Sequence, residues 1–154
     1  MKKYVLLLCT GLFLPFFSVL NAASGENDII RGHGARAVGM GGAFTAVADD
    51  TYAYYWNPAG LVFARKAAAG GYYDSVFGGR KINFGFNFVY PVEEGMAFSA
   101  AYARSVFWGT EFLDDVLYLS YGTYLDDFKK FALGVNFKAI GRSAPAYGLS
   151  GGTL

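Results

Sequence analysis

Residues 34–61 read GARAVGMGGAFTAVADDTYAYYWNPAGL, and the interpretation of the whole chain depends on this stretch. Three glycines, Gly39, Gly41 and Gly42, weigh against a regular helix, because each adds backbone entropy that helix formation must remove. The apolar residues fit neither a period of 3.6 nor a period of 2. The stretch closes on the turn sequence Asn57-Pro58-Ala59-Gly60, in which proline pushes the preceding residue out of the α region. We expect compact irregular backbone with room for one short helix, held inside something that satisfies its polar groups.

The polar residues of this region do not combine into a catalytic or metal site. Asp49 and Asp50 are adjacent, and neighbouring carboxylates rarely converge on one ion without further ligands. We therefore interpret the pair as a cap or a hydrogen-bonded turn. His33 is the only histidine, and we interpret it as a polar loop residue. The serines have no suitably placed histidine, so no enzyme, cofactor or metal is predicted.

Composition narrows the class of protein. The chain has 154 residues, of which 54% are hydrophobic, 19% aromatic and 16% charged, with 21 glycines. This mixture suits short strands and tight turns. The formal net charge of +1 and the lack of a basic patch argue against nucleic-acid binding. The single cysteine, Cys9, lies near the N-terminus, so the rest of the chain has no disulfide and no thiolate metal site.

The first 23 residues have the features of a secretory signal peptide. Lys2 and Lys3 form a positive start, an apolar run follows, and small residues end it at Ala22 and Ala23. The alternative is a retained membrane helix, but the small-residue end favours cleavage. A lipoprotein is excluded because Cys9 comes too early and follows Leu8. We expect an exported protein with residues 24–62 as a separate N-terminal segment.

From about residue 67 the hydrophobic pattern changes to a period of 2, which is typical of strands. The clearest example is residues 81–89, where bulky and small or polar residues alternate. Ile82, Phe84, Phe86 and Phe88 point one way, and Lys81, Asn83, Gly85 and Asn87 point the other. The pattern predicts about five strands within residues 63–154, near 67–73, 81–89, 96–103, 116–124 and 131–140. The segment from Gly141 onward is expected to be a loop.

The strand pattern favours an all-β fold, an antiparallel transmembrane β-barrel with lipid outside. One side of each strand is bulky and apolar, and aromatic residues collect near the strand ends. Arg104 departs from the pattern because it falls on the apolar side, which suits only a position near lipid headgroups. The alternative is a soluble β-sandwich with one wet face. Five strands cannot close such a barrel, because the smallest have about 8, so we expect the N-terminal part of a longer protein.

The motif in residues 34–61 also resembles a known family. Ala48-Asp49-Asp50 and, six residues later, Asn57-Pro58-Ala59 stand at the spacing found at the N-terminus of FadL-type outer-membrane barrels. The same signature is similar to PorV-type barrels and to a related uncharacterised family. The resemblance covers about 28 residues closely, and the strands after it agree only in kind.

The resemblance implies both a fold and a function. In FadL-type barrels this region is a hatch that plugs the lumen, so residues 24–62 are expected to be a hatch-like segment. Its motif is formed by Gly39, Gly41, Gly42, Asp49, Asp50, Asn57, Pro58 and Ala59. The three glycines would let the backbone pack closely against the wall, and Asn57-Pro58-Ala59 would set a turn. The implied function is passive uptake of hydrophobic small molecules across the outer membrane, with membrane lipid as the surroundings. The alternative is a PorV-like barrel that serves protein secretion or surface attachment; Trp56, directly before Asn57, favours it weakly.

Overall fold

The computed structural model describes residues 32–109, 112–126, 128–144 and 149–153. By compactness the chain divides into two units, Met1–Ile30 and Arg31–Leu154, and all described residues belong to the second unit. The expected signal peptide, residues 1–23, lies outside the described residues. In the part of the chain that is described, no helix is long and apolar enough to cross a membrane.

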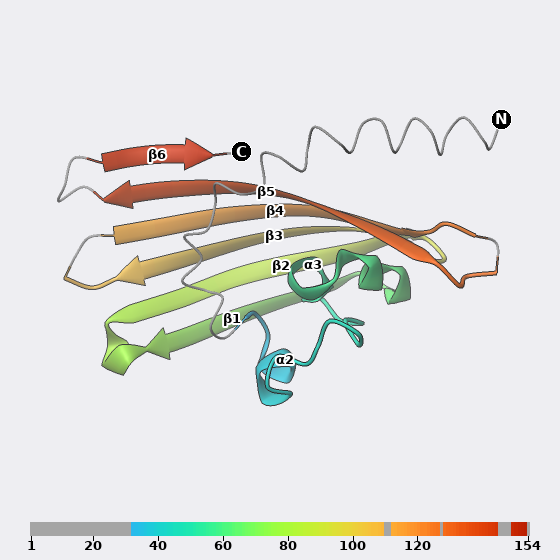
Figure 1. The fold of residues 1–154 in the computed structure, drawn as a ribbon, viewed down its shortest axis with the longest axis horizontal. Coiled ribbons are helices and arrows are strands. Elements are labelled where there is room, and N and C mark those ends of the chain that lie inside the picture. Colours follow the sequence, from blue (N-terminus) through green and yellow to red (C-terminus); the bar gives the residue numbers. More distant parts are fainter. Residues whose placement is uncertain (1–31, 110–111, 127, 145–148, 154) are drawn as a thin grey trace. The chain divides into compact units, whose positions relative to one another are not determined.

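The described strands form one antiparallel sheet, in which each strand pairs with the next along the chain (Figure 1). The six strands are β1 (Ala68–Val76), β2 (Lys81–Glu93), β3 (Met96–Phe107), β4 (Phe112–Tyr124), β5 (Ala132–Ala144) and β6 (Leu149–Thr153). A short 3-10 helix, η4 (Phe77–Gly79), follows β1. The expectation of an antiparallel, strand-rich chain with little helix is confirmed.

The strands are longer and more numerous than the sequence predicted. β4 starts at Phe112 instead of residue 116, and β5 continues to Ala144, where a loop was expected from Gly141. The sixth strand, β6, was missed altogether. Its sequence, LSGGT, has no alternation of bulky and polar residues. β6 is extended because its backbone pairs with β5, for example Ser150 with Ser143, and such pairing leaves no mark on hydropathy.

The predicted alternation across the strands is confirmed. Phe86 is 61% exposed, whereas Asn87, the next residue, is 3% exposed. We call the side with the bulky apolar residues the outer face and the opposite side the inner face. Exposed apolar side chains of the outer face are Phe86, Phe88, Tyr90, Phe98, Leu117, Leu119, Leu133, Val135 and Phe137. Buried inner-face residues include Asn83, Asn87, Ala97, Ser99, Ala101, Ala103, Ser105, Tyr118 and Ser120.

Residues 32–64, called the inner segment below, contain three short helices (Figure 1). These are α2 (Ala35–Gly39), α3 (Ala53–Trp56) and the 3-10 helix η3 (Pro58–Phe63). The backbone between them is irregular, as expected, but the number of helices exceeds the one anticipated. The Asn57-Pro58-Ala59-Gly60 sequence begins η3 instead of forming a terminating turn. Asn57 is extended and Pro58 occupies the first turn of η3, where a missing N–H costs nothing.

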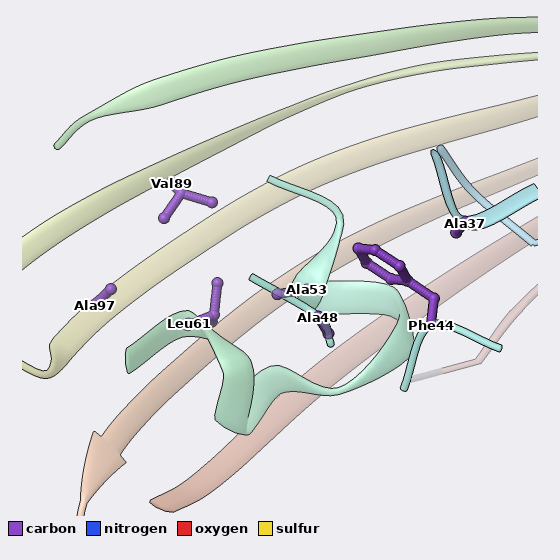
Figure 2. Close-up of a cluster of buried hydrophobic side chains, with 7 residues drawn as sticks. All are labelled: Ala37, Phe44, Ala48, Ala53, Leu61, Val89 and Ala97. Carbon is purple, nitrogen blue, oxygen red and sulfur yellow. The ribbon is translucent and has the colours of Figure 1, made fainter. Parts of the chain in front are cut away.

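The inner segment and the sheet share a hydrophobic cluster (Figure 2). Its buried members are Ala37, Phe44, Ala48, Ala53 and Leu61 from the inner segment with Val89 of β2 and Ala97 of β3. Phe44 is fully buried and also receives the guanidinium of Arg36, 5.2 Å from its ring centre. Four of the seven members are alanines, whose small side chains allow the backbone of the inner segment to lie close to the sheet.

Glycines of the sheet allow this close approach, and not the glycines of the inner segment. A Cβ at Gly134 of β5 would lie 2.0 Å from the backbone nitrogen of Ala59, and one at Gly122 of β4 would lie 2.6 Å from the carbonyl oxygen of Pro58. By contrast, a Cβ at Gly39 or Gly41 would meet nothing within 4 Å among the described residues.

Among the described strands, the expected packing of Gly39, Gly41 and Gly42 against the wall is therefore not seen. A Cβ on Gly42 would approach only the Trp56 ring, at 3.6 Å. Gly41 and Gly42 have φ values of +64° and +83°, which L side chains rarely adopt. These two glycines are explained by backbone conformation, which tight turns demand.

Candidate functional site

The contact between the inner segment and the inner face is the candidate functional site. Asn57 holds two parts of the segment together: its Nδ2 donates to the carbonyl of Thr45 at 3.0 Å, and its Oδ1 accepts from the Ala59 N–H at 3.2 Å. The second bond is an N-cap of η3. Asn57 thus fixes the local backbone as the sequence suggested, although it does so at a helix start.

The acidic pair is bound within the inner segment. Asp49 forms an ion pair and hydrogen bond with Arg36, and Asp50 lies 3.9 Å from the same guanidinium nitrogen. Asp50 also accepts from the Tyr52 N–H at 2.8 Å, an arrangement typical of an Asx turn. Among the described residues, no group of three or more His, Cys, Asp or Glu side chains is placed to hold a metal ion. The geometry is that of a carboxylate pair fixing a turn.

His33 is a loop residue, as the sequence indicated, but its burial was not predicted. It lies outside the helices and strands, and only 2% of it is exposed. Its Nδ1 lies 2.8 Å from the Tyr54 hydroxyl, its Nε2 lies 3.1 Å from the Tyr72 hydroxyl, and its ring stacks on Tyr55 at 4.2 Å. Trp56 Nε1 donates to the carbonyl of His33 at 2.8 Å. His33 therefore joins the inner segment to β1.

Aromatic residues of α3 extend this contact across the sheet. Tyr54 is fully buried with its ring 5.1 Å from Tyr118 of β4, and its carbonyl accepts from Asn136 Nδ2 of β5 at 2.8 Å. The Tyr52 hydroxyl donates to the carbonyl of Gly71 in β1 at 2.7 Å. Burial raises the pKa of Tyr52, while a contact with the Asn87 side chain lowers this pKa and the nearby Asp50 carboxylate raises it. The aromatic run in residues 52–56 was the available sequence signal for this site.

A row of polar side chains crosses the inner face, starting two residues after Tyr72 in β1. Strand register aligns Asp74, Asn83, Ser105, Asp114 and Arg142 across β1 to β5. Asn83 donates to Asp74 at 3.2 Å, Ser105 donates to Asn83 at 2.7 Å, and Arg142 donates to Asp114 at 3.1 Å. The inner face thus carries a hydrogen-bonded polar row beside its buried alanines and Tyr118.

A cavity of about 350 Å³ lies between the inner segment and the first two strands. Its lining includes Leu61, Phe63, Ala64, Ala68 and Val89, together with Asp49, Asp50, Thr51, Gly60, Arg65 and Lys66. This volume is at the lower end of the range of small-molecule sites. The lining combines an apolar wall with charged groups of both signs, which suits an amphiphilic or apolar ligand.

Arg104, the residue that departed from the strand pattern, does lie on the outer face. It pairs side-on with Asp115 of β4, with Nε–Oδ1 at 2.6 Å and Nη2–Oδ2 at 2.9 Å. The Tyr102 hydroxyl donates to the same carboxylate. The ion pair explains how a charged residue is accommodated on an otherwise apolar surface.

These features define a sheet with an exposed apolar face and an opposite face of small, polar and aromatic residues that packs against a short helical segment. Comparison with known proteins identifies no relative, because no protein-family model, no curated protein and no solved structure matches the chain.

Proposed function

We propose that the chain forms part of the wall of an outer-membrane β-barrel, with the inner segment as a hatch in its lumen. One observation carries this proposal: the sheet is inverted relative to a soluble protein. Its bulky apolar side chains, such as Phe86 and Leu119, are exposed, while Asn83, Asn87 and Ser105 on the opposite face are buried. Lipid-facing apolar residues alternating with small or polar lumenal residues are the pattern of transmembrane barrels.

The strand lengths support the same proposal. β2, β4 and β5 have 13 residues each and β3 has 12. A tilted strand needs about 9–11 residues to span the hydrocarbon core of a bilayer. These four strands are therefore long enough to cross a membrane and to project beyond it.

The soluble β-sandwich is the weaker alternative. A sandwich buries the apolar side of each sheet against a second sheet and leaves the polar side in water. Here the apolar side is the exposed one, over at least four adjacent strands. Soluble monomers rarely expose apolar patches beyond a few hundred Å².

The proposal requires further strands. Within the described residues, β1 pairs only with β2, and β6 pairs only with β5. Open sheet edges are not tolerated in hydrocarbon, because their N–H and C=O groups would have no partners. The edges must be completed by other strands of the same protein or by another copy.

For the activity, we propose passive movement of hydrophobic small molecules past the hatch. Support comes from the Asp49-Asp50 and Asn57-Pro58-Ala59 motif, which resembles FadL-type barrels, and from the partly apolar cavity beside it. A role in secretion or surface attachment is the second candidate. It was favoured by Trp56, but the Trp56 indole donates to His33 within the segment, so this residue adds no separate support.

Cell fractionation tests the location. The full-length protein is expected in the outer-membrane fraction and should run anomalously on gels unless it is heated. Recovery as a soluble periplasmic protein would contradict the barrel. Uptake of a hydrophobic solute by cells with and without the protein then tests the activity, and equal uptake would exclude transport of that solute.

A further inference from the structure

The outer face carries one charged cluster among its apolar side chains. Arg104 and Asp115 are direct cross-strand partners on β3 and β4. On the same face, the next pair of partners is Tyr102 and Leu117. The side chain of Arg104 is 39% exposed and that of Asp115 is 36% exposed. The cluster is thus accessible from the side that we assign to lipid.

The ion pair uses only one edge of the guanidinium. Arginine has five N–H donors in a planar fork. Asp115 occupies the Nε and Nη2 edge, and no described residue forms a hydrogen bond with Nη1. The hydroxyl of Tyr102 holds the carboxylate, and the guanidinium carbon lies 6.0 Å from the Tyr102 ring centre. Arg104 is therefore oriented by two neighbours and keeps a second donor edge for an acceptor from outside.

A shallow apolar groove of about 420 Å³ lies on the same face. Phe88, Phe98, Ala100, Leu119, Val135 and Phe137 are among the residues that line it. The small residue Ala100 stands between its strand partners Phe88 and Leu119. Ala100 is four residues from Arg104 on the same strand and face, a separation of about 13 Å at the usual strand rise. A molecule with a phosphate at one end and a hydrocarbon chain matches this arrangement.

We propose that Arg104 and this groove bind one membrane phospholipid at the surface of the barrel. The free edge of the guanidinium donates to the phosphate, the acyl chain lies over Ala100, and Tyr102 and Asp115 are positioning residues. The cluster has no net charge, so recognition depends on hydrogen bonds to the phosphate and not on a negatively charged lipid. The inference rests on the proposed membrane location.

The test uses the full-length protein in a nonionic detergent without phosphate. Native mass spectrometry counts bound phosphatidylethanolamine and, separately, diacylglycerol with the same acyl chains. We expect one phospholipid held at least about tenfold more tightly than diacylglycerol, since charge-assisted bidentate bonds are the strong ones. Arg104→Gln should remove this preference.

Arg142→Gln is the matched control. Arg142 pairs with Asp114, the neighbour of Asp115, but on the inner face. The Arg142→Gln substitution removes one positive charge, as Arg104→Gln does, yet the preference for phospholipid should remain. Equal loss in both variants, or an unchanged preference in Arg104→Gln, would overturn the inference.

Asp115→Asn separates positioning from charge. Arg104 keeps its charge but loses its ionic partner, so the cluster becomes positive. The variant should bind phosphatidylethanolamine severalfold more weakly and should now prefer anionic phosphatidylglycerol. If the two lipids remain equivalent, Asp115 has no positioning role and the inference fails. A protein that fractionates to the outer membrane but shows no preference would overturn only this inference, whereas a soluble protein would overturn the proposed function as well.

Discussion

Asn57 shows at the scale of one residue how the inner segment is fixed. Its amide bonds both the Thr45 carbonyl and the Ala59 N–H. Asn57→Ala should destabilise the segment by about 0.5–2 kcal/mol, because the cap of η3 is lost and the Thr45 carbonyl loses its donor. Leak of a hydrophobic solute through the reconstituted protein should rise, while the wall still assembles.

Thr45→Ala is the control for Asn57, because Thr45 contributes its carbonyl and its side chain is exposed. This variant should leave both stability and leak near the wild type. If Asn57→Ala changed neither flux nor denaturant stability, the segment would have no gating role.

His33 and Tyr54 provide a second prediction at the residue scale. Their side chains bond at 2.8 Å in a buried site. His33→Phe removes a partner from a buried hydroxyl, at a cost of about 1–3 kcal/mol. Adding Tyr54→Phe should recover part of this loss, since removing both partners of a hydrogen bond is often nearly neutral. Denaturant unfolding of the two single variants and the double variant gives the coupling free energy, and strictly additive losses would show that this bond contributes nothing.

Comparing the turn residues with His33 shows what the sequence could and could not reveal. The hydrogen-bonded turn at Asp50 follows from local backbone rules and was expected, whereas Asn57 caps the start of η3 and does not close the segment with a turn. The burial of His33 depends on Tyr72, 39 residues away, and on Tyr54, 21 residues away. A lone histidine among glycines has no local signal for such distant partners.

At the scale of elements, the fit of η3 against β4 and β5 depends on two glycines of the sheet. Gly134→Ala would place a Cβ 2.0 Å from the Ala59 nitrogen, so backbone must move. We expect a loss of about 1–3 kcal/mol or more, as for other overpacked sites. Gly39→Ala is the control, because nothing lies within 4 Å of its Cβ position among the described residues. Comparable thermal stabilities of the two variants would contradict the observed packing.

Strand prediction succeeded where the alternation was strong and failed where it was absent. In residues 81–89 phenylalanines alternate with asparagine and glycine, and both the strand and its two faces are confirmed. β6 and the end of β5 contain glycine, serine and alanine. These residues are extended because the two strands pair with each other. Likewise, the sequence shows Gly134 only as a residue that disfavours strands. Its role depends on the contact with η3, which the sequence does not reveal.

At the scale of the whole molecule, the inverted sheet makes one test decisive between membrane barrel and soluble sandwich. Leu119 is 48% exposed in the middle of the outer face, and Leu125 is 64% exposed in the turn after β4. In a bilayer, Leu119→Arg should cost about 2–4 kcal/mol near the midplane, whereas Leu125→Arg outside the strands should cost about 0–1 kcal/mol. For a soluble protein both changes would be exposed surface substitutions, within about 0.5 kcal/mol of the wild type. Reversible unfolding of the full-length protein from lipid vesicles measures the difference. A large loss confined to Leu119→Arg requires lipid against the outer face, and two equal, small effects would leave the apolar surface to be explained by a protein partner.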